Sequence, residues 1–418
     1  MLALTMTTLS SAADDARLII VDPGHFHATL IQKEMYPFLS PRVSVYARLS
    51  PELIDYLTRI QAFNARAENP THWELDVHTG PGFFERMLAE RAGNAVVFTG
   101  RNRGKIDRIL ASIEAGYNVF ADKPWIITSD GLPKLAAALD TAEKKGLAAY
   151  DIMTERFEIT SILQRELVNT PAVFGKPQSV KARSIHHVMK MVAGSPIRRP
   201  AWFFDGAEYG EALADVGTHV VDLVQWTLFS DRQLDYRKDV QILGARRWPT
   251  TLSPDQFRQV TGESRQDPLP FPGNNSVTYM LGGVRCELDI LWNWEAPAGA
   301  GDVYEASFAG TKSRVEIRQG AAEHWQPELY VVGETGAALD ARIAELARTW
   351  PGLSLEKHGG EARVLIPANY RVGHEAHFAQ VANQFFKYMK TPKDLPAWEK
   401  SNMLLKYYIT TKGVESAR

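Results

Sequence analysis

The sequence predicts an α/β Rossmann-type domain built on a parallel sheet, followed by an α+β domain with a mainly antiparallel, open-faced sheet. Two observations carry this prediction. Between residues 17 and 153, short runs rich in Val and Ile alternate with apolar residues at helical spacing, as in a parallel sheet covered by helices. From about residue 154 this alternation stops and several strand-like runs follow one another, which favours an antiparallel sheet.

The first domain, 17–153, is expected to contain five strands, each followed by a turn or a helix. The strands are predicted at 17–22, 43–47, 94–100, 118–122 and 147–153, and the helices at 27–39, 51–67, 83–93, 104–116 and 130–146. Pro51 suits the first turn of its helix, and Gly93, Gly116 and Gly146 close theirs. Ligands of such sheets bind at the carboxyl ends of the strands, so the strand tips are the segments to inspect for chemistry.

The second domain, 154–418, combines helices with successive strands. Helices are predicted at 154–169 and 212–229, and two closing helices at 373–390 and 397–417. Strand-like runs occupy 175–188, 236–248, 275–281, 284–294, 303–310, 313–320 and 327–333, and the polar stretch 249–275 reads as a surface insertion. Trp292 and Trp294 on an open sheet face favour a homo-oligomer.

Residues 1–16 form a candidate export signal. The stretch MLALTMTTLSSAA is similar to the apolar core and small-residue end of a secretory signal, although no basic residue precedes Arg17. We therefore expect a truncated signal and a periplasmic or secreted protein. The alternative is a cytoplasmic protein with an N-terminal tail.

The composition excludes several classes of function. The 418 residues are 45% hydrophobic and 23% charged, with a net charge of −2, which is typical of globular chains and argues against a nucleic-acid partner. The lone Cys286 allows neither an intrachain disulfide nor a CxxC zinc site, and we expect no metal. No apolar run reaches the ~20 residues that a membrane span requires.

The tip of the first strand departs from the dinucleotide fingerprint G-x-G-x-x-G. The stretch Asp22-Pro23-Gly24-His25-Phe26-His27 keeps only the middle glycine, Gly24, which lets the backbone approach a pyrophosphate closely. The two histidines either donate to phosphate or pack in the turn. Arg48, where an acid normally binds the adenosine ribose, either favours a 2′-phosphate or is a solvated loop residue.

Two further stretches carry chemistry. Lys123 follows a buried strand in Ala121-Asp122-Lys123-Pro124, where a lysine either points into the ligand crevice or is solvated. Asp215 and His219 are four residues apart and would share a helical face. A carboxylate beside an imidazole raises its basicity, but a surface ion pair has the same spacing.

Together these motifs resemble the glucose–fructose oxidoreductase / inositol dehydrogenase / MocA (Gfo/Idh/MocA) family, in a subgroup with a distinctive oxidoreductase C-terminal domain. GYNVFADKP (116–124) is similar to the family's strand-E-K-P motif with Asp for Glu, and GEALADVGTHVVDL (210–223) to its D-x-G-x-H-x-x-D motif. DPGHFHATL, RAENPTHWE and YDIMTERFEIT look typical of the subgroup. The resemblance covers nearly the whole chain from Arg17, but the first motif and TGRNRGK (99–105) depart from the family pattern.

The resemblance implies a role for each matching residue. Lys123 would contact the nicotinamide ribose and the reacting oxygen, and His219 would move the hydroxyl proton. Asp215 would orient the substrate and the histidine. Cofactor contacts are expected from Gly24, His25, Phe26, His27, Thr99, Arg101, Asn102, Asp122, Lys123 and Pro124. Apart from the resemblance, substrate contacts are expected from Asp151 and Trp202. His186 and His187 would lie on opposite faces of a strand, so at most one of them, taken here as His187, reaches the site.

These assignments predict an NAD(P)-dependent oxidoreductase, with NAD favoured, that acts on a secondary hydroxyl or keto group of a small carbohydrate. A redox-neutral glycoside cleavage with a retained cofactor is a second hypothesis, in which transient oxidation acidifies a neighbouring proton. A non-catalytic sugar or nucleotide sensor on the same scaffold is a third.

Overall fold

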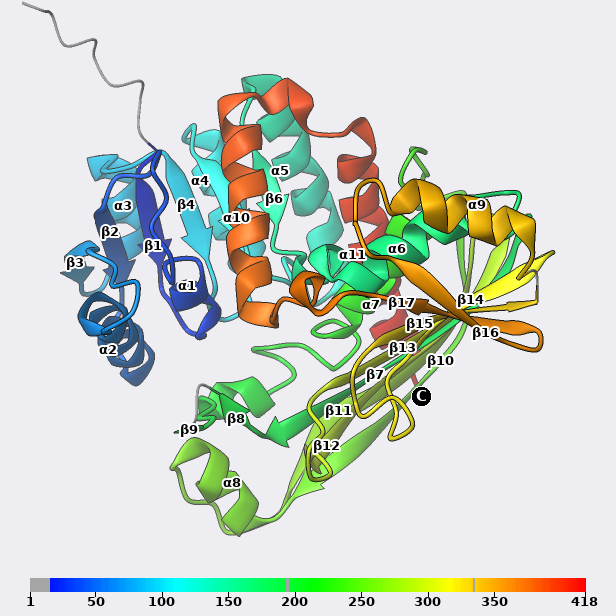
Figure 1. Ribbon diagram of the computed structural model, residues 1–418. Helices are drawn as coiled ribbons and strands as arrows, with labels where there is room; N and C mark the ends of the chain where they lie inside the picture. The colour runs from blue at the N-terminus through cyan, green and yellow to red at the C-terminus, as the bar shows by residue number, and fades with distance from the viewer. Residues whose placement is uncertain (1–15, 193–194, 334) are drawn as a thin grey trace, which may run out of the picture.

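The computed structural model describes residues 16–192, 195–333 and 335–418 (Figure 1). The predicted signal therefore lies outside the described residues except for Ala16. No helix of the described part of the chain is long and apolar enough to cross a membrane.

The first half forms the predicted parallel sheet, with six strands in the order β3-β2-β1-β4-β5-β6. The strands are β1 (Leu18–Val21), β2 (Arg42–Ala47), β3 (Glu74–Thr79), β4 (Ala95–Phe98), β5 (Asn118–Ala121) and β6 (Ala149–Asp151). All neighbouring strands in this sheet are parallel. The order reverses between β1 and β4, and the carboxyl ends of strands at such a reversal are where dinucleotides bind in this architecture.

Helices cover both faces of the parallel sheet. One face packs against α1 (His27–Leu30), α2 (Pro51–Ala65) and α10 (His374–Lys390). The other packs against α3 (Phe83–Glu90), α4 (Lys105–Glu114), α5 (Leu132–Lys145) and α11 (Ala397–Ser416). The last two helices, predicted within the second domain, therefore return to cover the first sheet, as Figure 1 shows for α10.

Two elements of the first half differ from prediction. The helix predicted at 27–39 ends at Leu30, because the chain then turns through Tyr36 into β2. The edge strand β3 was not predicted, because its sequence ELDVHT is polar and none of its residues is fully buried. An edge strand pairs with only one other strand and remains partly exposed to solvent, so it lacks the apolar run that marks a central strand.

The second half forms a nine-stranded sheet in the order β10-β11-β12-β7-β13-β14-β15-β17-β16. These strands are β7 (Pro177–Met189), β10 (Val240–Leu252), β11 (Leu269–Leu281), β12 (Val284–Glu295), β13 (Val303–Gly310), β14 (Ser313–Arg318), β15 (Glu328–Gly333), β16 (Ser354–His358) and β17 (Glu361–Leu365). Only β7 and β12 pair in parallel, so the predicted, mainly antiparallel sheet is confirmed. A separate pair of two-residue strands, β8 (Met191–Val192) and β9 (Ser195–Pro196), is antiparallel.

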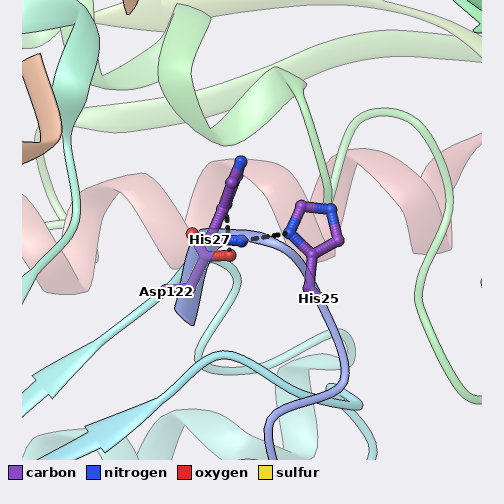
Figure 2. Close-up of side chains that lie close together, drawn as sticks. All are labelled: His25, His27 and Asp122. Carbon is purple, nitrogen blue, oxygen red and sulfur yellow. Dashed lines mark hydrogen bonds and ion pairs between the residues drawn. The ribbon is translucent and has the colours of Figure 1, made fainter. Parts of the chain in front are cut away.

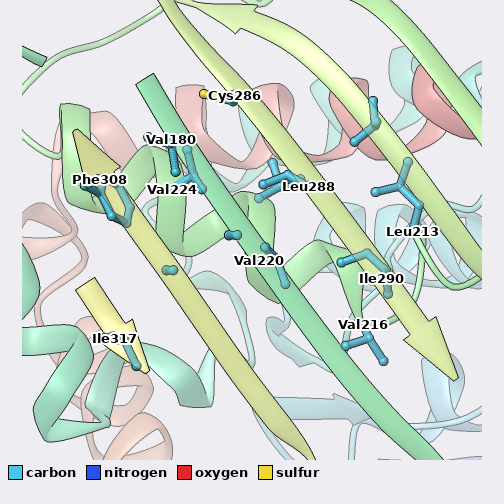
Figure 3. Close-up of a cluster of buried hydrophobic side chains, with 14 of the residues drawn as sticks. Val180, Leu213, Val216, Val220, Val224, Cys286, Leu288, Ile290, Phe308 and Ile317 are labelled. Atoms are coloured by element: carbon cyan, nitrogen blue, oxygen red, sulfur yellow. The ribbon is translucent and has the colours of Figure 1, made fainter. Parts of the chain in front are cut away.

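Helices α6 (Ile159–Val168) and α7 (Gly217–Phe229) cover one face of this sheet, while α8 (Pro254–Thr261) and α9 (Ala337–Leu346) lie at its ends. Figure 3 shows Val216, Val220 and Val224 of the α7 segment facing Leu288 and Ile290 of β12. The predicted insertion 249–275 is shorter than expected, because β10 runs to Leu252 and β11 begins at Leu269.

The opposite sheet face is polar rather than aromatic. It carries Lys181, Arg183, Glu287, Asp289, Glu305, Glu316 and Arg318. Trp292 is 4% exposed and lies in the core on the helix side, so the aromatic argument for an oligomer does not hold. The homo-oligomer itself stays a prediction.

Candidate active site

Two adjoining cavities lie between the carboxyl edge of the parallel sheet and the second sheet. The larger, of about 1040 Å³, runs from Gly24 past the start of α2 to the 196–203 segment. The smaller, of about 500 Å³, is lined by Lys123, Asp215 and His219. His25 and Phe26 at the tip of β1 line both cavities, as do Arg199 and Phe203 of the 196–203 segment.

Lys123 and Asp215 join the two halves of the molecule at the smaller cavity. Lys123 follows β5, and its ammonium donates to Oδ1 of Asp215 in the turn before α7. Both residues are buried, with 7% and 3% of their surface exposed. Burial alone would lower the pKa of Lys123, but Asp215 and Asp122 raise it above its ordinary value, so this cavity contains a fixed ammonium group.

His219 lies in the first turn of α7 and lines the same cavity. Burial, and then the positive charge of Lys123, lowers the pKa of His219 to about 4. Nδ1 is buried without a hydrogen-bond partner in the described part of the chain, so Nε2 is the nitrogen that can meet a ligand. At neutral pH His219 is therefore an uncharged imidazole that can accept a proton.

The predicted Asp215–His219 pair is not formed. The helix begins at Gly217, so Asp215 precedes it and turns to Lys123 and to the hydroxyl of Tyr209, which donates to Oδ1 at 3.0 Å. The two residues share the cavity, as the family resemblance implies, but Asp215 positions Lys123 rather than the imidazole.

His25, His27 and Asp122 gather beside Lys123 (Figure 2). His27 Nδ1 lies 2.8 Å from Asp122 Oδ2, and the backbone N–H of His27 donates to His25 Nδ1 at 3.4 Å. Their potential ligand atoms lie within 4.8 Å of one another, so these residues could hold a metal ion. Burial, followed by nearby positive groups, lowers the pKa of both imidazoles well below 6.5, and those same positive charges oppose a dication.

The departures from the fingerprint at the β1 tip have a physical explanation. Asp22 replaces the first glycine and takes the left-handed conformation that glycine adopts easily, with φ +46°. Its carboxylate is held by Arg48, at 3.1 and 2.8 Å, and by Arg108 at 3.3 Å. At Gly24 an added Cβ would meet the Trp202 ring at 3.0 Å and Gly100 at 3.1 Å, so this glycine is required by close packing.

The residues expected at the fourth-strand tip have separate roles. Thr99 is buried and its hydroxyl has no partner in the described residues, while Arg101 lines the larger cavity. Asn102 lines neither cavity, because its amide donates to the Tyr209 carbonyl at 2.6 Å and its side-chain oxygen accepts from Lys105 at 2.6 Å. The backbone carbonyl of Pro124 likewise accepts a hydrogen bond from the Lys105 ammonium.

The structure places the three expected substrate residues away from the smaller cavity. Asp151 is buried against Lys406 and Tyr407. His187 faces the opposite side of β7 from His186, which does line the cavity. Trp202 lines the larger cavity, where its indole donates to Glu52 at 2.6 Å.

Sequence reasoning missed several residues that line the smaller cavity, and of the two β7 histidines it chose His187 rather than His186. Ser184, His186, Lys190, Arg199, Asp302 and His374 all lie on its wall. They come from four separate segments, and only the alternation along β7, which puts Ser184 and His186 on one face, could have indicated any of them. The fold and these cavities define a protein in which a crevice lies between a Rossmann-like parallel sheet and a mostly antiparallel sheet.

Comparison with known proteins identifies the class. The family "Putative oxidoreductase C terminal domain" matches residues 163–418. A "putative oxidoreductase" from Parabacteroides merdae is 42% identical, with TM-score 0.93 over 97% of this chain and 98% of that chain. The chain therefore belongs to this family, a Gfo/Idh/MocA-like group of oxidoreductases.

More distant structures share the fold alone. Levoglucosan dehydrogenase in complex with NADH and L-sorbose is 13% identical, with TM-score 0.61 over 96% of this chain and 97% of that chain. A variant 3-ketoreductase from Actinomadura kijaniata, in complex with TDP-benzene and NADP, is 13% identical, with TM-score 0.60 over 97% and 98%. No curated protein matches the chain.

Proposed function

We propose that this oxidoreductase uses a nicotinamide dinucleotide to oxidise or reduce a secondary hydroxyl or keto group of a sugar. The observation that carries the proposal is the fixed ammonium of Lys123 and the uncharged imidazole of His219 on the wall of one cavity at the carboxyl edge of a Rossmann-type sheet. The distant relatives solved with NADH and L-sorbose or with NADP support this class of substrate and cofactor.

The residues around the crevice fit a dinucleotide. Asp122 Oδ1 and Thr99 Oγ1 are buried at the ends of β5 and β4 without a partner among the described residues, and polar groups in that state require a ligand or water. Gly24, His25 and Arg101 would hold the nucleotide along the larger cavity. NAD is favoured over NADP, because the Arg48 guanidinium already donates to both carboxylate oxygens of Asp22.

Each side chain of the smaller cavity has a distinct task. A bound nicotinamide would supply the acceptor or donor of two electrons. His219 takes the proton of the substrate hydroxyl at Nε2 when the sugar is oxidised, and returns it when a ketone is reduced. Lys123 stabilises the negative charge that develops on the same oxygen, and Asp215 holds its ammonium in place.

The test has a binding arm and an activity arm. The purified protein is denatured and any released nucleotide identified, and sugar oxidation is then followed by NADH and NADPH absorbance. We expect Lys123→Met and His219→Asn to lower turnover by about 10²-fold or more. Lys134→Met is the matched control, since this lysine pairs on the surface with Asp107. Full activity in either site variant would overturn the proposal, whereas a sensor would bind nucleotide and sugar without turnover in the wild-type protein.

A further inference from the structure

The wall of the smaller cavity also carries a hydroxyl, an imidazole and a carboxylate that contact one another in that order. Ser184 and His186 are alternate residues on the cavity-facing side of β7, and Asp302 precedes β13. His186 Nε2 lies 3.0 Å from Ser184 Oγ, and His186 Nδ1 lies 3.1 Å from Asp302 Oδ2. The oxidoreduction at Lys123 and His219 uses none of these residues.

Asp302 is an ionised carboxylate that fixes the orientation of the imidazole. Burial alone would raise its pKa, but His186, His187 and Lys190 hold it well below the usual value. A carboxylate can only accept hydrogen bonds. Because this carboxylate faces Nδ1 of His186 at 3.1 Å, the tautomer that it favours carries its hydrogen on Nδ1. In that tautomer Nε2 is the basic atom and accepts from the Ser184 hydroxyl.

The contact between His186 and Asp302 is not needed to hold Asp302 against β7. The ion pair of Lys190 with Asp302, at 2.6 Å, and the backbone N–H of His187, at 3.1 Å, already tie the carboxylate to β7. His186 adds a basic nitrogen on the wall of the cavity that Lys123 and His219 also line, beside the Trp292 ring at 5.2 Å. One substrate in this cavity therefore meets two imidazoles that come from different elements.

We propose that Ser184, His186 and Asp302 form a second proton-transfer site, which removes the proton from the carbon next to the carbonyl of a keto sugar bound at Lys123. This inference rests on the proposed function for its substrate class, because a carbonyl is what makes such a proton acidic. His186 acts as the base, and Asp302 and Ser184 position it.

The step balances without a change in oxidation state. The C–H bond breaks and its proton goes to His186 Nε2, which then donates to Ser184 Oγ. The electron pair of that bond forms the C=C bond of an enolate, and the carbonyl π pair moves onto the oxygen beside the Lys123 ammonium. The reverse step delivers a solvent-derived proton, so the carbon exchanges its hydrogen with water. A leaving group on the next carbon would instead be expelled, which is what redox-neutral glycoside cleavage requires.

The experiment measures proton exchange separately from oxidoreduction. The full-length protein is incubated in deuterium oxide with methyl 3-keto-β-D-glucopyranoside, and loss of the signals of the hydrogens flanking the carbonyl is followed by proton NMR. Reduction of the same compound is followed by consumption of NADH or NADPH. We expect the wild-type protein to exchange faster than buffer, and His186→Gln to lower the ratio of exchange to reduction by about tenfold or more.

Two further variants keep the test interpretable. His358→Gln, at an exposed histidine of β16 that faces Glu356, should keep the wild-type ratio. Asp302→Asn should lower the ratio as His186→Gln does, because an amide no longer fixes the Nδ1–H form, and circular dichroism verifies that each variant is folded.

The outcomes separate the two hypotheses. Exchange at the buffer rate by the wild-type protein, or an unchanged ratio in both His186→Gln and Asp302→Asn, overturns the second site. Exchange that depends on His186, with no consumption of either nucleotide, supports the second site and contradicts the proposed oxidoreduction.

Discussion

Replacing His219 should affect activity and acid stability in opposite directions. In the folded protein, burial and Lys123 lower the pKa of His219 from 6.5 to about 4. The unfolded chain therefore binds a proton between these pH values that the folded chain does not bind. Acidification thus destabilises the wild-type protein through His219, and this loss is complete below pH 4. At about 1.4 kcal/mol per pKa unit, the loss is about 3 kcal/mol.

His219→Gln removes this penalty together with the base. The variant should lose about 10²–10⁴-fold in turnover at neutral pH. Its free energy of unfolding relative to wild type should rise by about 3 kcal/mol between pH 7.5 and pH 4. Urea unfolding at a series of pH values, followed by tryptophan fluorescence, measures this difference. Parallel stability curves for the two proteins would refute the claim that His219 is a desolvated, uncharged base.

Three further predictions concern Gly24 at the tip of β1, the buried carboxylate of Asp222 and the His25–His27–Asp122 cluster. Gly24→Val should weaken nucleotide binding, measured by calorimetry, because its side chain would collide with Trp202; Gly244→Ala, where nothing lies within 4 Å of an added Cβ, should bind normally. Asp222→Asn should cost about 3–5 kcal/mol of unfolding free energy at neutral pH, because this 1% exposed carboxylate binds Arg156 and Lys406. Since those cations lower the pKa of Asp222 to about 2 despite burial, the difference should shrink as the pH falls from about 4. Elemental analysis of the purified protein should find no stoichiometric metal at the His25–His27–Asp122 cluster, and one equivalent of zinc or manganese would contradict the electrostatic argument.

The fold was predictable wherever burial imposes a clear sequence period. The central strands β1 and β4 are four-residue apolar runs that are buried on both sides, and such runs stand out in any sequence. The edge strand β3 and the terminal hairpin β16–β17 expose much of their surface, so their sequences carry little apolar signal. The return of α10 to the first sheet could not be predicted, because helical periodicity reveals an apolar face but not what that face covers.

The site was predictable only where a motif fixes a residue close to a strand or helix end. Lys123 follows β5 directly and His219 lies in the first turn of α7, so short-range geometry places both at the crevice. Asp302 lies more than a hundred residues from His186 in the sequence, and it meets His186 only because β13 pairs with β7. That pairing is a property of the folded sheet, and no spacing in the sequence encodes it.

A series of hydrogen bonds between the two halves of the molecule positions Lys123 and Asp215 before any ligand binds. Asn102, at the β4 tip, donates to the carbonyl of Tyr209, and the Tyr209 hydroxyl donates to Asp215, which holds Lys123. Each group in this chain is buried, so breaking any link would leave a polar atom without a partner, at a cost of about 1–3 kcal/mol. Relative movement of the two domains would have to break several such links together. The Lys123 ammonium is therefore positioned by the same contacts that link the two halves of the molecule. None of the binding energy of a substrate is needed to align it.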